Sequence, residues 1–64
     1  MAFKIRYHCG EIEMEVADAE SLEQARIIID LKRADIACKA EVAMIFRISP
    51  SGTEELEESM KLHS

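Results

Sequence analysis

The sequence has no tryptophan and few aromatic residues of any kind, with two phenylalanines and one tyrosine among 64 residues. A chain of this length buries only about 60 % of the surface that its unfolded form exposes, so few residues remain to wall a ligand pocket behind the core. We therefore expect a protein that is not an enzyme, with no catalytic residues and no cofactor. The apolar content of 48 % is still sufficient for a small core, which excludes wholesale disorder.

Long apolar runs are also missing. The run that contains AMIF at 43–46 is no longer than one strand, whereas a membrane-spanning helix needs about 20 apolar residues. The first residues, MAFKIRYHC, alternate between charged and apolar side chains, unlike the basic start and apolar run of a secretory signal. These features predict a cytoplasmic protein with no membrane partner, in which Cys9 and Cys38 are reduced.

Glycine, cysteine and histidine are too sparse to form the usual site motifs. The two glycines, Gly10 and Gly52, stand too far apart for a phosphate-binding loop. The candidate soft metal ligands are His8, Cys9, Cys38 and His63. The first two are adjacent and would face opposite sides of a strand, and the others stand alone, so no pair has zinc-site spacing. We predict no metal site.

Acidic residues, by contrast, are abundant: the formal net charge is −5, and residues 49–64 hold four glutamates against one lysine. The four are Glu54, Glu55, Glu57 and Glu58. Clustered carboxylates imitate a phosphate backbone and attract basic proteins. This run is therefore a predicted interface to a basic partner, and the alternative is that it merely forms a solubilising start to a helix.

Direct nucleic-acid binding is not expected. It requires a net basic face or stacking aromatic side chains. The predicted outer face of the sheet carries Lys4, Arg6, His8 and Arg47, but glutamates balance them and no aromatic residue lies among them.

One long helix is predicted from Ser21 to about Asp35. Ser21 is a good N-cap, and Gln24 three residues later completes a capping-box pattern. At about 100° per residue, one broad apolar stripe points to a core; it consists of Leu22, Ala25, Ile28, Ile29 and Ile36.

A second apolar strip, Ile27, Leu31 and Ala34, falls on the side of this helix away from the first. Two interpretations are open. In the first, the strip belongs to the monomer, either because the C-terminal segment covers it or because the core stripe is wide. In the second, the strip is an interface to a second copy or to a different protein, because exposed apolar patches usually mark partners. We predict an interface, foremost with a second copy.

The strands are predicted from alternation. Residues 3–9 and 11–16 form a hairpin that turns at Cys9-Gly10, in a register that pairs His8 with Glu11 and Phe3 with Val16. Residues 41–48 form a third strand, whose inward side chains are predicted to be Val42, Met44, Phe46 and Ile48. Ser49-Pro50-Ser51-Gly52 is a break, and residues 53–63 are predicted to form a short second helix.

The predicted fold is α+β, with a three-stranded antiparallel sheet in which the first strand lies between the second and the third. The main helix covers one face. Residues 1–50 make one ββαβ domain, and residues 51–64 make a short acidic helix or tail.

These features predict a small, non-enzymatic, acidic protein-binding module. It would act as an inhibitor or adaptor on a basic nucleic-acid-handling partner, a phage-type inhibitor such as an anti-CRISPR being one example. The alternative is a homodimeric structural or regulatory subunit that pairs through the second apolar strip. A third interpretation is a small enzyme or ligand-binding module completed at a dimer interface.

Overall fold

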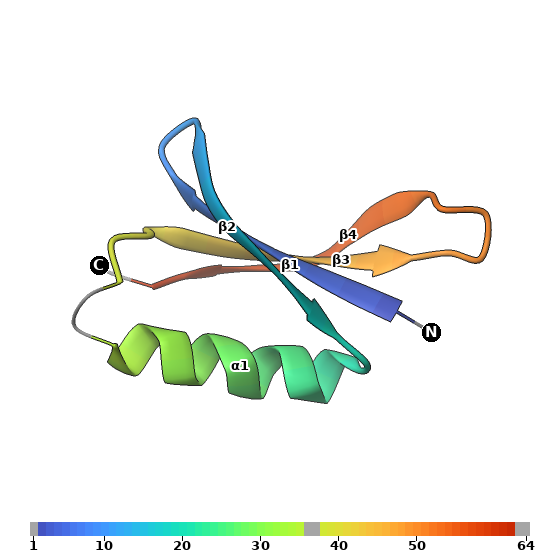
Figure 1. Cartoon of the computed structure of the whole chain (residues 1–64), viewed down its shortest axis with the longest axis horizontal. Helices are drawn as coiled ribbons and strands as arrows, with labels where there is room; N and C mark the ends of the chain where they lie inside the picture. Colours follow the sequence, from blue (N-terminus) through green and yellow to red (C-terminus); the bar gives the residue numbers. More distant parts are fainter. Residues whose placement is uncertain (1, 36–37, 63–64) are drawn as a thin grey trace.

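A computed structural model describes residues 2–35 and 38–62. It contains one helix and four strands in the order β1 (Ala2–Cys9), β2 (Ile12–Ala19), α1 (Leu22–Ala34), β3 (Val42–Ile48) and β4 (Glu54–Lys61). The strands form one antiparallel sheet of order β2-β1-β3-β4, and α1 lies across one face of it (Figure 1). Ile36 and His63, to which the sequence analysis gave roles, lie outside the described residues.

Helix α1 begins as predicted. The Ser21 hydroxyl accepts a hydrogen bond from the Gln24 backbone N–H (3.0 Å), and the Gln24 side-chain oxygen accepts one from the Glu20 backbone N–H (2.5 Å). The first bond satisfies a helix-end donor that would otherwise have no partner. The second reaches the residue before the N-cap, whereas in a capping box the Gln24 side chain would accept from the Ser21 N–H. The helix ends at Ala34, where Lys32 and Arg33 in the last turn suit the negative end of the helix dipole.

The core lies between α1 and the sheet. Ala25 and Ile29 of the helix are fully buried against Ile5, Tyr7 and Ile45 of the two central strands. The rest of the buried cluster is Ala19, Ala40, Ala43 and Leu62. Small residues on β2 and β3 let the helix approach the sheet closely.

The prediction of a three-stranded sheet with a second helix is wrong. Residues 54–61 form β4, which pairs antiparallel with β3 and widens the sheet to four strands. As a helix, this segment would present only Leu56 and Met60 as its apolar strip, which is marginal in water. As a strand it pairs with β3, packs Met60 against the core and is followed by Leu62, which is buried.

The Ser-Pro-Ser-Gly break is the turn of the β3–β4 hairpin. Ser49 and Thr53 pair through the Ser49 N–H and the Thr53 carbonyl (2.9 Å), and the Gly52 N–H donates to the Ser49 carbonyl (2.9 Å). Gly52 has a φ of 90°, a conformation that glycine adopts without strain. The break therefore reverses the chain and does not end the fold.

The predicted register of the β1–β2 hairpin is also wrong. The turn is Gly10-Glu11, so that Cys9 pairs with Ile12, and an irregularity between Tyr7 and His8 shifts the register once more, which brings Phe3 opposite Ala19. A shift of an odd number of residues exchanges the two faces of a strand. Beyond the irregularity the shift is three residues, so the alanines of β2 face the helix and Val16 lies on the opposite face; Ile12, where the shift is two residues, and Met14 are exposed as well.

The facing of β3 is the reverse of the prediction. Ala43 and Ile45 are fully buried beneath α1, and Arg47 lies on that side too. The side chains that were predicted to point inward, Val42, Met44, Phe46 and Ile48, lie half-buried on the opposite face. Because both alternating sets of this strand are apolar, its sequence alone did not decide between them; its pairing with Ile5 and Tyr7 did.

Candidate protein-interaction surfaces

The acidic run of β4 is bound by the chain's own arginines. Glu58 points toward the helix layer and forms a two-point ion pair with Arg26 of α1 (2.6 and 3.1 Å). The hydrogen bonds that Arg26 donates to Glu58 lower the pKa of Glu58 and raise the pKa of Arg26. Glu54 points to the other face, where Arg6 of β1 holds it at 2.9 Å.

The two remaining carboxylates of the run share one partner. Arg47 of β3 contacts Glu55 at 3.2 Å and Glu57 at 3.1 Å. The four glutamates of the predicted interface are thus divided between the two faces of the sheet and paired with three arginines. They do not form one open row of carboxylates, which is what an imitation of a phosphate backbone requires.

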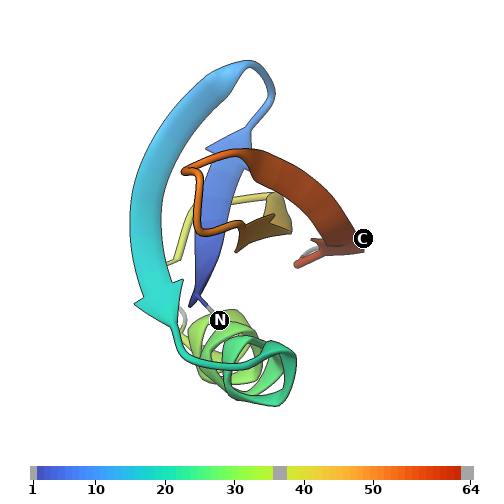
Figure 2. The ribbon, with the colours of Figure 1, turned by 90° about the vertical axis from the view of Figure 1, so that its right-hand side faces the viewer.

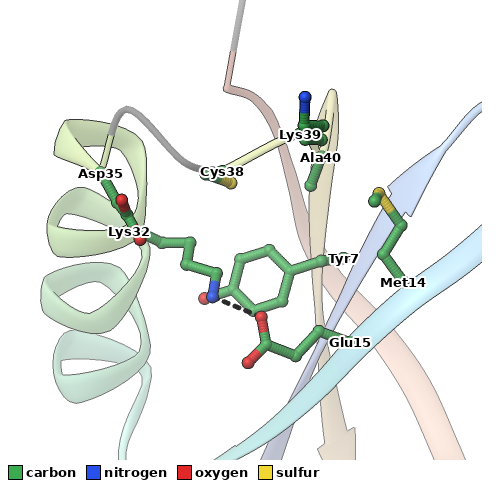
Figure 3. Close-up of a pocket in the computed structure, with 8 residues that line it drawn as sticks. All are labelled: Tyr7, Met14, Glu15, Lys32, Asp35, Cys38, Lys39 and Ala40. Carbon is green, nitrogen blue, oxygen red and sulfur yellow. Dashed lines mark ion pairs between the residues drawn. The ribbon is translucent and has the colours of Figure 1, made fainter.

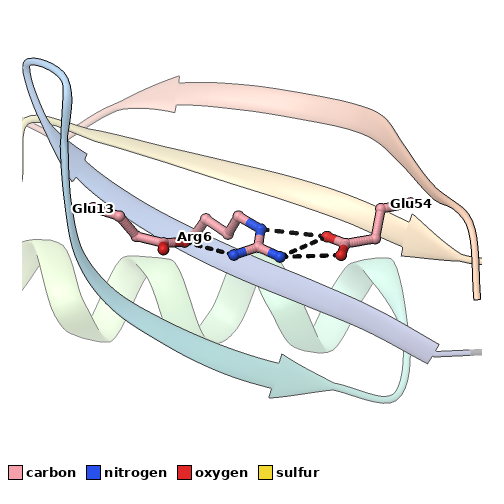
Figure 4. A network of polar contacts seen from close by, with 3 residues as sticks. All are labelled: Arg6, Glu13 and Glu54. Carbon is pink, nitrogen blue, oxygen red and sulfur yellow. Dashed lines mark hydrogen bonds and ion pairs between the residues drawn. The ribbon is translucent and has the colours of Figure 1, made fainter.

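Arg6 joins the two sides of the sheet on the face opposite α1 (Figure 4). Its guanidinium contacts Glu13 of β2 at 2.6 Å and Glu54 of β4 through two nitrogens, and it lies 5.7 Å from the centroid of the Phe46 ring. The hydrogen bond to Glu13, followed by that to Glu54, raises the pKa of Arg6. The most central positive charge on this face is therefore already neutralised and offers little to a phosphate.

We call the face opposite α1 the outer sheet face; Figures 1 and 2 show it as the side of the twisted sheet that no other element covers among the described residues. Its apolar row is Val42, Met44, Phe46 and Ile48 of β3. Leu56, which is 57 % exposed, extends the row onto β4; Val16 of β2, which is 43 % exposed, lies on the same face but is separated from the row by Arg6 of β1. A pocket of about 340 Å³, lined by Ala2, Ile48, Ser49 and Pro50, lies at one end.

The second apolar surface is the strip on α1 that the sequence predicted to be an interface, here called the helix strip: Ile27, Leu31 and Ala34. Ile27 is 55 % exposed, Leu31 is 70 % exposed, and Ala34 is also exposed. The described part of the C-terminal segment, through residue 62, does not cover the strip, because it forms β4 at the edge of the sheet. Figure 1 shows α1 on one side of the sheet, and the exposed helix strip lies opposite the buried Ile29 on the helix, so the strip and the outer sheet face lie on opposite sides of the molecule.

A pocket of about 400 Å³ lies where the end of α1 meets β1 and β2 (Figure 3). The Tyr7 ring forms its floor, and Lys32 sits 5.5 Å from the ring centroid while paired with Glu15. The bond to Glu15 raises the pKa of Lys32, so this ammonium stays charged and does not act as a base. Burial is the main cause that raises the pKa of Tyr7.

The cysteines do not form a reactive or metal-binding group among residues 2–35 and 38–62. The Cys9 thiol donates to Glu41 (3.6 Å), whose negative charge raises the pKa of the thiol; a nucleophilic cysteine needs the opposite shift. Cys38 is a free thiol at the edge of the Tyr7 pocket. No cluster of three or more His, Cys, Asp or Glu side chains is placed to hold a metal ion in this part of the chain.

Sequence reasoning missed the outer sheet face. The signal was present, since β3 is apolar at Val42, Ala43, Met44, Ile45 and Phe46 in succession. Such a continuous run is typical of strands that are covered on both faces, whereas alternation is typical of strands covered on one. Glu41 and Arg47, at the two ends of the run, belong to the same alternating set, which suggested a strand covered on one face only and obscured this signal.

Comparison of the chain with protein-family models, with curated proteins and with solved structures found no match. Within the described ranges, α1 is too short and too polar to cross a membrane.

Proposed function

We propose that this chain is a small, non-enzymatic protein-binding module that contacts its partner mainly through apolar side chains. The observation that carries the proposal is the helix strip, where Ile27 and Leu31 are more than half exposed on the side of α1 that faces away from the core. Full burial of one such side chain contributes about 1.5–3 kcal/mol. A partner that covers both therefore gains several kcal/mol before its costs of association.

Two further observations support binding over catalysis. Cys9 has a raised pKa beside Glu41, and the ammonium of Lys32 is committed to Glu15. Neither group is prepared to act as a nucleophile or base near neutral pH. We also infer a cytoplasmic location, because both cysteines are free thiols.

The second candidate is an inhibitor or adaptor that binds a basic nucleic-acid-handling protein through charge. The observation that favours it lies on β2 and the start of α1, since residues 9–25 hold six acidic residues and no lysine or arginine. Four of them form no ion pair with another described residue: Glu11, Asp18, Glu20 and Glu23. These four carboxylates would face the basic partner.

Capture of partners from a lysate of the source cells separates the two candidates. Immobilised protein is washed first at low and then at high salt. An apolar interface retains its partner at high salt, and Leu31→Asp releases the partner. A charge-based interface loses its partner at high salt, and also when Glu11, Glu20 and Glu23 are replaced with glutamine.

Ile12→Asp is the matched control for Leu31→Asp, because Ile12 is also 70 % exposed but lies at the tip of the β1–β2 hairpin. A partner that is retained at high salt by wild type, by Ile12→Asp and equally by Leu31→Asp would contradict binding through the helix strip.

A further inference from the structure

We propose that copies of this chain associate head to tail, with the helix strip of one copy seated on the outer sheet face of the next. The inference rests on the proposed function, binding through apolar surfaces, and adds the identity of the partner and the arrangement. Both surfaces lie on one molecule, on opposite sides, and within the described residues no other helix or strand covers either, although the Arg6 guanidinium lies over the Phe46 ring of the outer sheet face.

The two surfaces match in length. Helix α1 has 13 residues and is about 20 Å long. The apolar row runs along β3, whose seven residues also span about 20 Å. A helix laid along this row would place Ile27 and Leu31 over it, with Leu56 on one flank.

The chain already contains this kind of contact. Helix α1 covers the inner face of the sheet through Ala25 and Ile29, and β3 presents apolar side chains to both faces. A helix from a second copy on the outer face would cover β3 on its second side. Strands with such a continuous apolar run are typically covered on both faces. The product is a stack of alternating helix and sheet layers.

Charge favours a helix on a sheet over a helix on a helix. The side of α1 that points away from the core carries Glu23, which forms no ion pair with a described residue, and Asp30, which is paired with Arg33 at 3.5 Å; two helix strips in contact would bring the Glu23 carboxylates of both copies together. The outer sheet face is balanced, with bases Lys4, Arg6 and Lys61 and acids Glu13, Asp18 and Glu54.

The basic residues of the outer sheet face differ in whether they are already paired. Arg6 already occupies Glu13 and Glu54, whereas Lys4 and Lys61 form no ion pair with a described residue. These two ammonium groups are available to Glu23 of an incoming helix, whose Asp30 is already paired with Arg33. Lys4→Glu should therefore weaken association, and added salt should weaken it less than it would weaken a purely ionic contact.

This contact joins two different surfaces, so it closes on itself only if the rotation between copies completes a ring; otherwise it grows as a filament. A helix laid on a sheet buries on the order of 400 Å² on each copy, which is below the roughly 800 Å² per partner of standard specific interfaces and is typical of weak contacts. We therefore expect weak association that is visible in the upper micromolar range.

The test is sedimentation of two purified variants, alone and mixed. Ile27→Asp disables the helix strip and leaves the outer sheet face; Leu56→Asp disables the outer sheet face and leaves the helix strip. Val16→Asp is a second variant of the outer face, for use if Leu56→Asp disturbs β4. Ile12→Asp again controls for an exposed charge, and circular dichroism verifies that each variant is folded.

Head-to-tail association predicts that wild type and Ile12→Asp form species larger than dimers as concentration rises. Each disabled variant alone remains monomeric, and an equimolar mixture of the two forms a one-to-one dimer that grows no further. If Leu56→Asp alone still dimerised, the pair would form through two helix strips; if Ile27→Asp alone still dimerised, it would form through two outer faces.

Either result would overturn the head-to-tail arrangement while leaving apolar binding in place. A wild type that stays monomeric throughout would overturn self-association altogether. The proposed function would then be decided by the lysate capture, which does not depend on a second copy.

Discussion

At the scale of single residues, Tyr7 carries the one buried side-chain polar atom in the described residues that has no hydrogen-bond partner. Its ring is 1 % exposed in the middle of the core, where the hydroxyl is desolvated without compensation. We expect Tyr7→Phe to leave the free energy of unfolding unchanged or to raise it by up to about 1–2 kcal/mol. Urea unfolding of the purified monomer measures the difference.

Tyr7→Ala is the control for the ring itself and should cost about 3 kcal/mol or more, because it opens a cavity beneath α1. A loss of more than about 1 kcal/mol in Tyr7→Phe would contradict the account, since that is the typical contribution of a hydroxyl that is hydrogen-bonded in the folded protein.

At the scale of elements, ion pairs attach α1 to both edges of the sheet: Arg26 to Glu58 of β4 and Lys32 to Glu15 of β2. The pKa of Glu58 is lowered in the folded state, chiefly by its hydrogen bonds from Arg26. A carboxyl group with a lowered pKa stabilises the fold above its unfolded-state pKa, about 4.3. That contribution is lost as the pH falls through the lower, folded-state pKa.

Glu58→Gln should therefore be less stable than wild type near neutral pH, and the difference should shrink as the pH falls below about 4. Urea unfolding between about pH 7 and pH 3 measures it. Glu11→Gln removes a carboxylate that forms no ion pair with the described residues and serves as the control for net charge. A difference for Glu58→Gln that grew on acidification would have the wrong sign for this mechanism.

The sequence was informative about elements with local signals and less so about those that depend on tertiary contacts. Ser21 and Gln24 predicted the start of α1, and the alternation located the three strands before residue 49, although β2 runs to Ala19, three residues beyond the predicted end. Residues 54–61 carry no strand pattern of their own; they form β4 because β3 offers a free edge and Arg6, Arg26 and Arg47 receive its glutamates.

One candidate surface was likewise predictable from a local sequence signal, and the other depended on tertiary contacts. The helix strip was predictable from the 3.6-residue period, which placed Ile27 and Leu31 opposite the buried Ile29. The outer sheet face was not, because a one-residue choice of facing in β3 decides whether Phe46 or Ile45 enters the core. The acidic run was located in the sequence, but its pairing with arginines required the sheet.

At the scale of the whole molecule, the fold is a thin slab with extents of 35 × 23 × 16 Å. One helix and one sheet make two layers, which is the minimum that can enclose a core. The helix and β3 each carry apolar residues on a second side, so both outer sides of the slab bear apolar patches. We propose that these two sides bind the partners of the protein.

The most direct test of this central claim compares Ile27→Asp with Ile29→Asp in urea unfolding of dilute protein. If the helix strip is an interaction surface, Ile27→Asp leaves the unfolding free energy within about 0.5 kcal/mol of wild type. Ile29→Asp buries an unpaired charge in the core and abolishes folding. If Ile27→Asp instead unfolded as readily as Ile29→Asp, the strip would belong to the core of the monomer and the account would be contradicted.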